Sequence, residues 1–404
     1  MTVLLNDNIV SALGFTAEEN YRNVKQGVCG LKFFADRYDL PEPFMASEID
    51  DVRLNESFAG VSAGVSAVTG KKTMAGHDKA DVWKEKNKVK YSKLEKAAIV
   101  SVSEALKGTN VDPSNGRVLF ILSTTKGNVF LLDENESQGY ERDQLLLCRS
   151  AELIARFFGN GNPPMVVSNA CISGASAMIT AQRELRSGRF DYVIVTGADV
   201  LSKFIVTGFQ SFKALSQNVC KPFDANRAGL NIGEAVATAI MTERSENELR
   251  NGDIEFTAGA VRNDANHISG PSRTGEGSCL ALRAVMKGID PDEIAFVSAH
   301  GTATLYNDEM EAVALARAGL HHVPVSGLKG YFGHTLGAAG VLESVISTRA
   351  LKDGIILKTY GLETPGVTNP LDIVTENRKT TKRRCIKMLS GFGGCNVATL
   401  FTKY

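Results

Sequence analysis

The sequence predicts an α/β protein that consists of two similar βαβ halves. Short β-branched runs alternate with amphipathic segments, a pattern typical of buried parallel strands covered by helices. The pattern occurs twice, on either side of a charged and polar stretch at residues 242–253. The 404 residues also exceed the usual size of a single core. We expect one half over residues 1–245 and the other over 246–404, although no residue-level repeat is strong enough to prove a duplication.

Strand and helix segments alternate in the first half. Three β-branched runs, at residues 117–124, 165–170 and 191–199, predict strands. Between them, residues 144–159 and 173–188 have the apolar periodicity of helices. This order predicts parallel strands joined by helical crossovers.

The same alternation returns in the second half. It predicts further strands at residues 254–261, 293–300 and 323–327, and helices at residues 278–288, 307–319 and 335–354. Residues 48–93 follow neither pattern, because a run of small residues there leads into the charged segment 77–93. We interpret that charged segment as the solvated face of a helix rather than a binding patch.

Composition excludes several classes of function. Lys plus Arg total 45 and Asp plus Glu total 45, so bulk charge does not favour nucleic-acid binding. The seven cysteines have no CxxC spacing, which indicates neither a zinc site nor a disulfide framework. No run reaches the ~18 apolar residues of a membrane span, and the amino terminus lacks the basic region of a secretory signal. We expect a soluble, cytoplasmic protein with reduced thiols and no metal.

Cys171 is the first candidate for chemistry. It ends the β-branched run 165–170 and precedes the small-residue start of a predicted helix. Backbone N–H groups and the positive end of the helix dipole favour thiolate over thiol at such a position, and the thiolate is the nucleophile. A cysteine flanked by small residues is also common as a buried structural group.

His300 and His334 give Cys171 possible partners. Each follows a predicted strand of the second half, and ligand crevices in α/β sheets form at the carboxyl ends of strands. Either histidine alone has an ordinary structural interpretation. Three reactive side chains at equivalent positions, however, predict that they converge on one site.

Six motifs in fixed order then resemble one family. They are NACISGASA (169–177), KPFDANRAGLNIGEA (221–235), NDANHISGP (263–271), HGTATLYNDEMEA (300–312), LKGYFGHTLGAAG (328–340) and GFGGCN (391–396). Together they resemble the β-ketoacyl-acyl-carrier-protein synthases of the elongating Cys-His-His type, in the thiolase-like superfamily. The resemblance runs from Arg117 to the carboxyl terminus. It implies a thiolase-like fold, a five-layered αβαβα arrangement in which the first half carries the nucleophile and the second half the two histidines.

The resemblance also implies an activity, that of an acyltransferase. Cys171 would take an acyl chain from acyl-carrier protein, and a decarboxylated malonyl unit would attack it to give a β-ketoacyl product. His300 and His334 would hold the malonyl thioester oxygen and assist decarboxylation. The backbone N–H groups of Cys171 and Phe392 would form the oxyanion hole, with glycines beside Phe392 allowing the close approach and its ring gating the acyl pocket.

Further residues match supporting positions of the family. Lys329 would tune the neighbouring histidine, although a solvated loop lysine is the plain alternative. Glu311, with Asp308 nearby, matches an acidic position, but both could simply be charges near the start of a helix. Thr302 and Thr304 match groups that bind the phosphopantetheine arm, with turn formation as the alternative.

The resemblance implies partners as well. The substrates would be carried on the phosphopantetheine of acyl-carrier protein, and the chain itself would bind no cofactor. A homodimer is expected because the family buries an edge strand against its twofold mate, and a heterodimer with a related subunit is the alternative. Neither nucleic acid nor a membrane is an expected partner.

Departures from the family pattern keep other functions open. The amino terminus lacks the TG-x-G turn, so we expect the first strand to be abbreviated or altered. Ser390, Cys395 and Leu230 replace residues that are usual in the family. These changes are compatible with housekeeping fatty acid synthesis or a polyene or polyketide pathway. A non-catalytic chain-length or scaffold subunit and a coenzyme A thiolase are the two alternatives, opposed by the retained Cys171 and by the GFGGCN turn respectively.

Overall fold

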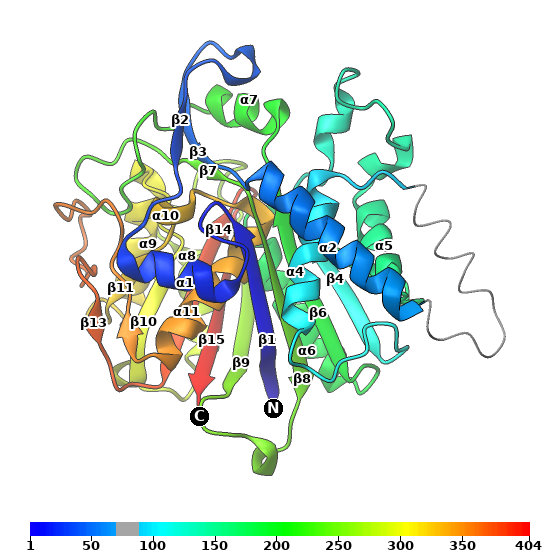
Figure 1. Ribbon diagram of the computed structural model, residues 1–404. Helices are drawn as coiled ribbons and strands as arrows, with labels where there is room; N and C mark the ends of the chain where they lie inside the picture. Colours follow the sequence, from blue (N-terminus) through cyan, green and yellow to red (C-terminus); the bar gives the residue numbers. More distant parts are fainter. Residues whose placement is uncertain (70–88) are drawn as a thin grey trace.

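One ten-stranded sheet forms the framework of the protein (Figure 1). The computed structural model describes residues 1–69 and 89–404. In spatial order the strands are β11 (Val325–Gly327), β10 (Ile294–Ala299), β14 (Arg384–Gly391), β15 (Cys395–Lys403), β9 (Ile254–Asn263), β1 (Thr2–Ser11), β8 (Ala235–Glu243), β6 (Tyr192–Asp199), β4 (Val118–Ser123) and β5 (Met165–Val167).

The sheet consists of two five-stranded halves with the same topology. In the first half β5, β4 and β6 are parallel, whereas β8 is antiparallel to both β6 and β1. In the second half β11, β10 and β14 are parallel, and β15 is antiparallel to both β14 and β9. The halves join through a short antiparallel pairing of β1 with β9, at Val3 and Leu4. The fold therefore repeats one five-stranded pattern although the sequence shows no clear repeat.

Helices form three layers around these half-sheets. On the outer face of the first half lie α4 (Lys93–Leu106) and α5 (Leu147–Phe157), and on that of the second half lie α8 (Glu276–Val285) and α9 (Leu305–Arg317). Two helices, α6 (Ser173–Arg186) and α11 (Ala339–Lys352), contact strands of both halves and pack against each other. Because these two helices form a central layer, the arrangement is αβαβα, as the family resemblance implied.

The central helices approach each other more closely than ordinary side chains allow. A Cβ atom added to Gly174 of α6 would lie 2.8 Å from the backbone nitrogen of Val341 in α11. A Cβ on Gly340 of α11 would clash with the backbone nitrogen of Ala175 in α6. Glycine is therefore required on both sides of this contact, which lies near the amino ends of both helices.

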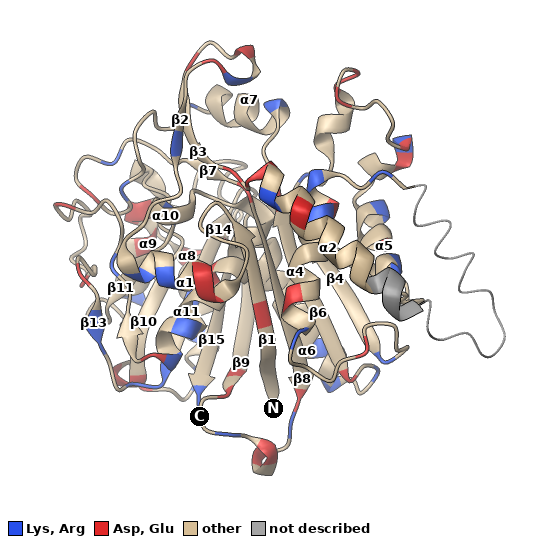
Figure 2. Cartoon of the chain, in the orientation of Figure 1, with Lys and Arg blue, Asp and Glu red and all other residues tan. Residues whose placement is uncertain are grey.

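The remaining helices and strands belong neither to the ten-stranded sheet nor to these helices, and one of them, Lys329–Phe332, is fully buried. They are α1 (Ala17–Gln26), α2 (Asp51–Thr69), α7 (Lys203–Ser211), α10 (Lys329–Phe332), the three-stranded sheet of β2 (Lys32–Phe34), β3 (Phe44–Ser47) and β7 (Ile232–Gly233), and the pair β12 (Ile355–Ile356) and β13 (Arg378–Lys379). Acidic and basic residues are interspersed over these elements, in keeping with the balanced composition (Figure 2). Within residues 1–69 and 89–404, none of the helices has the length and apolar character that crossing a bilayer requires.

The first strand corrects one expectation from the sequence. Instead of being abbreviated, β1 has ten residues and pairs with β8 along its whole length, from Thr2 to Ser11. The missing glycines affect only the turn after the strand, which closes through backbone hydrogen bonds between Ser11 and Gly14. The buried Asn20 side chain adds a bond to the Gly14 carbonyl, at 3.0 Å. Most of the charged segment 77–93 lies outside the described residues, which resume at residue 89.

Candidate active site

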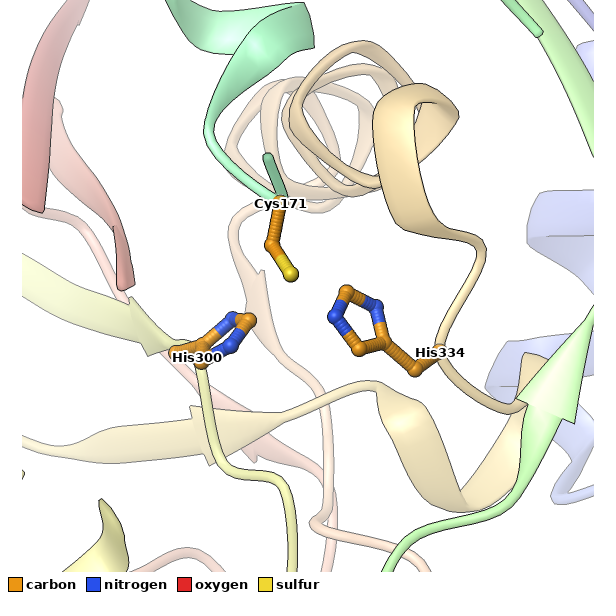
Figure 3. Close-up of side chains that lie close together, drawn as sticks. All are labelled: Cys171, His300 and His334. Atoms are coloured by element: carbon orange, nitrogen blue, oxygen red, sulfur yellow. The ribbon is translucent and has the colours of Figure 1, made fainter. Parts of the chain in front are cut away.

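The three predicted reactive residues, Cys171, His300 and His334, lie close together (Figure 3). Cys171 lies four residues after β5 and two before α6, His300 follows β10, and His334 follows α10, the short helix after β11. The Cys171 sulfur and one nitrogen from each imidazole all lie within 4.8 Å of one another. All three residues are at most 7% exposed. The three side chains therefore converge as their positions after strands predicted, with Cys171 from the first half of the chain and both histidines from the second.

The backbone around Cys171 is shaped to present the sulfur. Ala170, immediately before it, has a left-handed φ of +45°, a conformation that costs energy for a residue with a side chain. The helix then starts with Ile172 as its N-cap, which has no side-chain capping bond. Cys171 thus lies at the positive end of α6, as expected.

Burial reverses the expected ionisation of the cysteine. Desolvation raises the pKa of the Cys171 thiol to about 12, against the opposing positive charge of Lys329 and a hydrogen bond from the backbone N–H of Phe392. The helix end alone was expected to favour thiolate, and this expectation is wrong for the free site. The cost of burying a charge outweighs the favourable helix position.

Both histidines are neutral in this site. Burial, followed by the charge of Lys329, lowers the pKa of each imidazole well below its usual value. The Nδ1 atom of His334 accepts a hydrogen bond from the Leu336 backbone N–H at 3.3 Å, so its proton is assigned to Nε2. Among the described residues, neither His334 Nε2 nor His300 Nδ1 has a hydrogen-bond partner. The ring centroids are 5.1 Å apart and the rings nearly perpendicular, at 84°.

The loop that carries His300 is held by two buried carboxylates. Glu311 accepts hydrogen bonds from the backbone N–H groups of His300 and Gly301, both at 2.6 Å. Asp308 accepts from Thr302 N–H at 3.1 Å. Burial raises the pKa of Asp308 to about 6, and burial together with the Asp308 charge raises that of Glu311. Both side chains are fully buried, so they bind the loop instead of serving as solvated charges at the start of α9.

Lys329 belongs to a buried charged cluster below the histidines. Its Nζ atom donates to the His300 carbonyl at 2.8 Å and to Glu343 at 2.7 Å. Lys387, on β14, also contacts Glu343. The three side chains are at most 2% exposed, which excludes a solvated loop lysine at position 329.

Sequence reasoning missed two members of this cluster, Glu343 and Lys387. Each had a visible signal, since Glu343 is a lone carboxylate in the apolar segment 339–346 and Lys387 interrupts the apolar run 385–389. Charged residues are almost never fully buried unless they are paired. The two residues lie 44 positions apart in the chain, and nothing in the sequence indicated that they pair.

The turn between β14 and β15 faces the cysteine. A Cβ on Gly391 would lie 2.8 Å from the Cys395 sulfur and 3.1 Å from Ala170 Cβ, so only glycine fits without a shift. Gly393 and Gly394 have left-handed φ values of +85° and +74°. This turn brings the Phe392 N–H to the Cys171 sulfur, as an oxyanion hole requires.

The Phe392 ring belongs to an aromatic cluster. Its centroid lies 5.9 Å from that of Phe209, which is stacked on it, and 5.5 Å from that of Phe212, which meets it edge-on. The ring is 38% exposed and lines the same cavity as both partners. The two partners come from α7 and the residues after it, and sequence reasoning did not identify them.

A cavity of about 520 Å³ gives access to the site. It is lined by Cys171 and both histidines, and also by Thr302 and Thr304. The two threonine hydroxyl groups are hydrogen-bonded to each other at 2.9 Å. Both threonines thus line the same cavity as the Cys171 sulfur.

Two models of known protein families together match most of the chain. The model of the β-ketoacyl synthase N-terminal domain matches residues 9–247, and that of the β-ketoacyl synthase C-terminal domain matches residues 255–363. A 3-oxoacyl-acyl-carrier-protein synthase 2 of Vibrio cholerae is 31% identical over 262 residues, covering 61% of this chain and 63% of that protein. The corresponding synthase of Rhizobium meliloti is 30% identical over 258 residues, covering 60% of this chain and 61% of that protein. The alignments thus span less than two thirds of these relatives.

Solved structures agree on the fold over the full length. A ketosynthase in complex with its chain length factor, from Xenorhabdus doucetiae, has a TM-score of 0.81 at 24% identity and covers 100% of this chain and 98% of that chain. A β-ketoacyl synthase from Burkholderia phymatum gives the same TM-score and identity, covering 100% of this chain and 99% of that chain. At this identity the similarity concerns the fold alone.

Proposed function

Because the chain belongs to the β-ketoacyl synthase family of the thiolase-like superfamily, we propose that it is a condensing enzyme that extends an acyl chain held on Cys171. The donor is the thioester of an acyl-carrier protein and the extender is a malonyl thioester on the same kind of carrier. The observation that carries this proposal is the buried set of Cys171, His300 and His334 at the end of one cavity.

The first half-reaction loads the acyl chain. The Cys171 thiol is protonated in the free site, so attack requires loss of its proton. The neutral imidazole of His300, within 4.8 Å, can accept it, whereas His334 Nε2 already carries a proton. The sulfur attacks the thioester carbonyl, and the backbone N–H groups of Cys171 and Phe392 stabilise the resulting oxyanion. Collapse of this intermediate releases the carrier thiol and leaves the acyl chain on the sulfur.

The second half-reaction extends the chain. The carbon–carbon bond to the malonyl carboxylate breaks, carbon dioxide leaves, and negative charge develops on the thioester oxygen. The Nε2–H group of His334, which has no hydrogen-bond partner within residues 1–69 and 89–404, is a donor for that oxygen, with His300 as the second donor. The carbanion then attacks the acyl carbonyl on Cys171. The products are a β-ketoacyl thioester and the free cysteine.

Other residues support these steps. Thr302 and Thr304, on the cavity wall, bind the phosphopantetheine arm that delivers each thioester. Lys329, Glu311 and Asp308 hold the histidine loop, and the Phe392 ring gates the acyl chain. The proposed reaction needs neither a bound cofactor nor a metal, since the reacting groups are side chains, backbone N–H groups and the carrier thioesters.

A chain-length or scaffold role in a heterodimer is the second candidate function. One of the structural relatives is a ketosynthase in complex with its chain length factor. The intact Cys171, His300 and His334 favour the catalytic member of such a pair. Homodimer and heterodimer both remain compatible with the proposed reaction, which we assign to the cytoplasm.

A thiolase is disfavoured by the turn after β14. There Cys395 is buried and its thiol donates to the Phe392 carbonyl, at 3.3 Å. That bond to the backbone of the turn opposes a second nucleophile at this position; burial and a raised pKa do not, because Cys171 shares both.

Covalent loading tests the proposal directly. The protein is incubated with octanoyl-acyl-carrier protein, and the peptide that holds Cys171 is examined by mass spectrometry. We expect one octanoyl adduct on Cys171, followed by a β-ketoacyl product when malonyl-carrier protein is added. The Cys148→Ala variant, at an exposed cysteine, is the matched control and should load normally. Octanoylation that persists in Cys171→Ala would refute the proposal.

A further inference from the structure

Lys387 lies below the site but takes no part in the steps above. It is on β14, which runs parallel to β10 with Lys387 paired to Ser298. Its side chain is fully buried, and Nζ donates to the carbonyl of Ala299 at 2.7 Å and to that of Ser298 at 3.2 Å. It also forms an ion pair with Glu343 of α11.

Both lysines bind backbone carbonyl groups at the end of β10. Lys329 donates to the carbonyl of His300, while Lys387 donates to those of the two preceding residues, so three successive carbonyl groups at the end of β10 bind an ammonium group. Each lysine also contacts a different oxygen of Glu343. The strand end that carries His300 is therefore fixed from two directions.

Pairing with Glu343 does not account for the second lysine. Glu343 and Lys329 alone would form a neutral pair, whereas the trio of two lysines and one glutamate carries a net charge of +1, and Glu311 of α9 is a further buried carboxylate that attracts Lys387. Burying an additional cation costs free energy unless it serves another interaction. Consistent with that cost, burial lowers the pKa of Lys387, against the attraction of Glu343.

The positive cluster acts on His300 together with other groups. Charged or titratable groups surround His300 on every neighbouring element. Lys329 of α10, Lys387 of β14 and His334 act on the imidazole, and the Cys171 sulfur lies within 4.8 Å of an imidazole nitrogen. Glu311 and Asp308 of α9 bind the backbone of the loop, and Glu343 of α11 binds both lysines. After burial itself, the charges that act on the imidazole are those of Lys329, His334 and Lys387, and they disfavour its protonation.

We propose that Lys387 is a positioning residue for condensation, which fixes the backbone below His300 and supplies the excess positive charge that keeps this imidazole neutral. The inference rests on the proposed function, in which a neutral histidine donates a hydrogen bond to the malonyl thioester oxygen. Lys387 itself touches neither substrate nor the reacting atoms.

A set of charge variants separates this role from simple packing. Lys387→Met lowers the cluster charge to zero and leaves Glu343 paired with Lys329, so no unpaired buried charge is created. The double variant Lys387→Met/Glu343→Gln restores a charge of +1 without the Lys387 contacts. Lys387→Gln is the second neutral variant, in case the methionine variant does not fold. Carbon dioxide release from malonyl-carrier protein is measured as a function of pH, beside octanoyl loading of Cys171.

We expect the acidic limb of the pH profile of decarboxylation to move toward higher pH by roughly one pH unit in both neutral variants, because loss of a nearby positive charge favours the imidazolium. The double variant should return the limb toward its wild-type position, and octanoyl loading at neutral pH should fall less than decarboxylation does in Lys387→Met. Equal losses in both half-reactions with an unmoved limb would overturn the proposal.

A second readout does not depend on turnover. The pKa of His300, followed by NMR with ¹³C-labelled histidine, should rise in either neutral variant relative to wild type. An unchanged His300 pKa overturns the inference even if activity falls. Failure of the wild-type protein to decarboxylate malonyl-carrier protein instead counts against the proposed function, while the NMR titration still decides the role of Lys387.

Discussion

Adding one methyl group at Gly391 should disconnect the oxyanion hole from the cysteine. The new Cβ would lie 2.8 Å from the Cys395 sulfur, 3.1 Å from Ala170 Cβ and 3.2 Å from the Cys171 nitrogen. Carbon contacts are most favourable near ~3.5 Å or beyond, so the turn must move by several tenths of an ångström. Phe392, the next residue, would carry its N–H away from the sulfur.

The structure gives the size of both effects. Overpacking of this kind costs ~1–3 kcal/mol of stability, and loss of one oxyanion donor slows the reaction by ~10²–10³. We therefore expect Gly391→Ala to fold with a lowered Tm and to load octanoate onto Cys171 at least about a hundredfold more slowly. Rapid-quench mass spectrometry of the Cys171 peptide measures the loading rate, and thermal unfolding measures the stability.

Two further variants test the geometric reason. Gly116→Ala is the matched control, because a Cβ there meets no atom within 4 Å. Adding Cys395→Ala to Gly391→Ala removes the sulfur nearest the new methyl group and should restore part of the loading rate. Normal loading by Gly391→Ala, or a double variant no faster than the single one, would refute the reasoning.

Three further outcomes are expected. His300→Ala and His334→Ala should each abolish carbon dioxide release from malonyl-carrier protein while Cys171 still loads in part, and an equal loss of both half-reactions in folded protein would count against the assigned roles. Because burial raises the pKa of the Cys171 thiol to about 12, its alkylation by iodoacetamide should accelerate about tenfold per pH unit from pH 7 to 10, whereas a plateau near neutral pH would contradict that ionisation. Glu311→Ala should leave two buried backbone N–H groups unpaired and reduce unfolding free energy by ~1–3 kcal/mol in denaturant titration; an unchanged midpoint would contradict its role.

The sequence predicted the parts of the fold that have a clear period or motif. Strands β4, β6 and β10 and helices α6 and α11 appear within a few residues of their predicted bounds. These segments are strongly apolar or amphipathic, and their local pattern determines their structure.

Other elements depended on contacts that the sequence does not reveal. The residues of β1 include two asparagines and an aspartate, which made a full strand hard to recognise, yet β8 and β9 pair with it. Strands β14 and β15, in the interior of the sheet, were not predicted as strands at all. Their formation depends on pairing with each other and with β9 and β10.

The candidate site, too, was predictable from the sequence only in part. The sequence located Cys171, His300, His334 and Lys329 because each has a recognisable neighbourhood, but it did not reveal how burial changes their ionisation. The thiol pKa is raised by desolvation, a quantity that depends on the three-dimensional surroundings. The pairing of Glu343 with both lysines likewise arises only when β14, α10 and α11 come together.

The glycine contact between α6 and α11 has a consequence for reactivity. Cys171 precedes the amino end of α6 and His334 precedes that of α11, so each reacting group is attached to one of two helices that meet backbone to backbone. The Gly174 and Gly340 contact therefore works as a spacer of fixed length between the nucleophile and the hydrogen-bond donor. A single methyl group on either glycine would widen that spacing without touching a reactive atom. The distance from the His334 imidazole to a thioester on the Cys171 sulfur would increase with it.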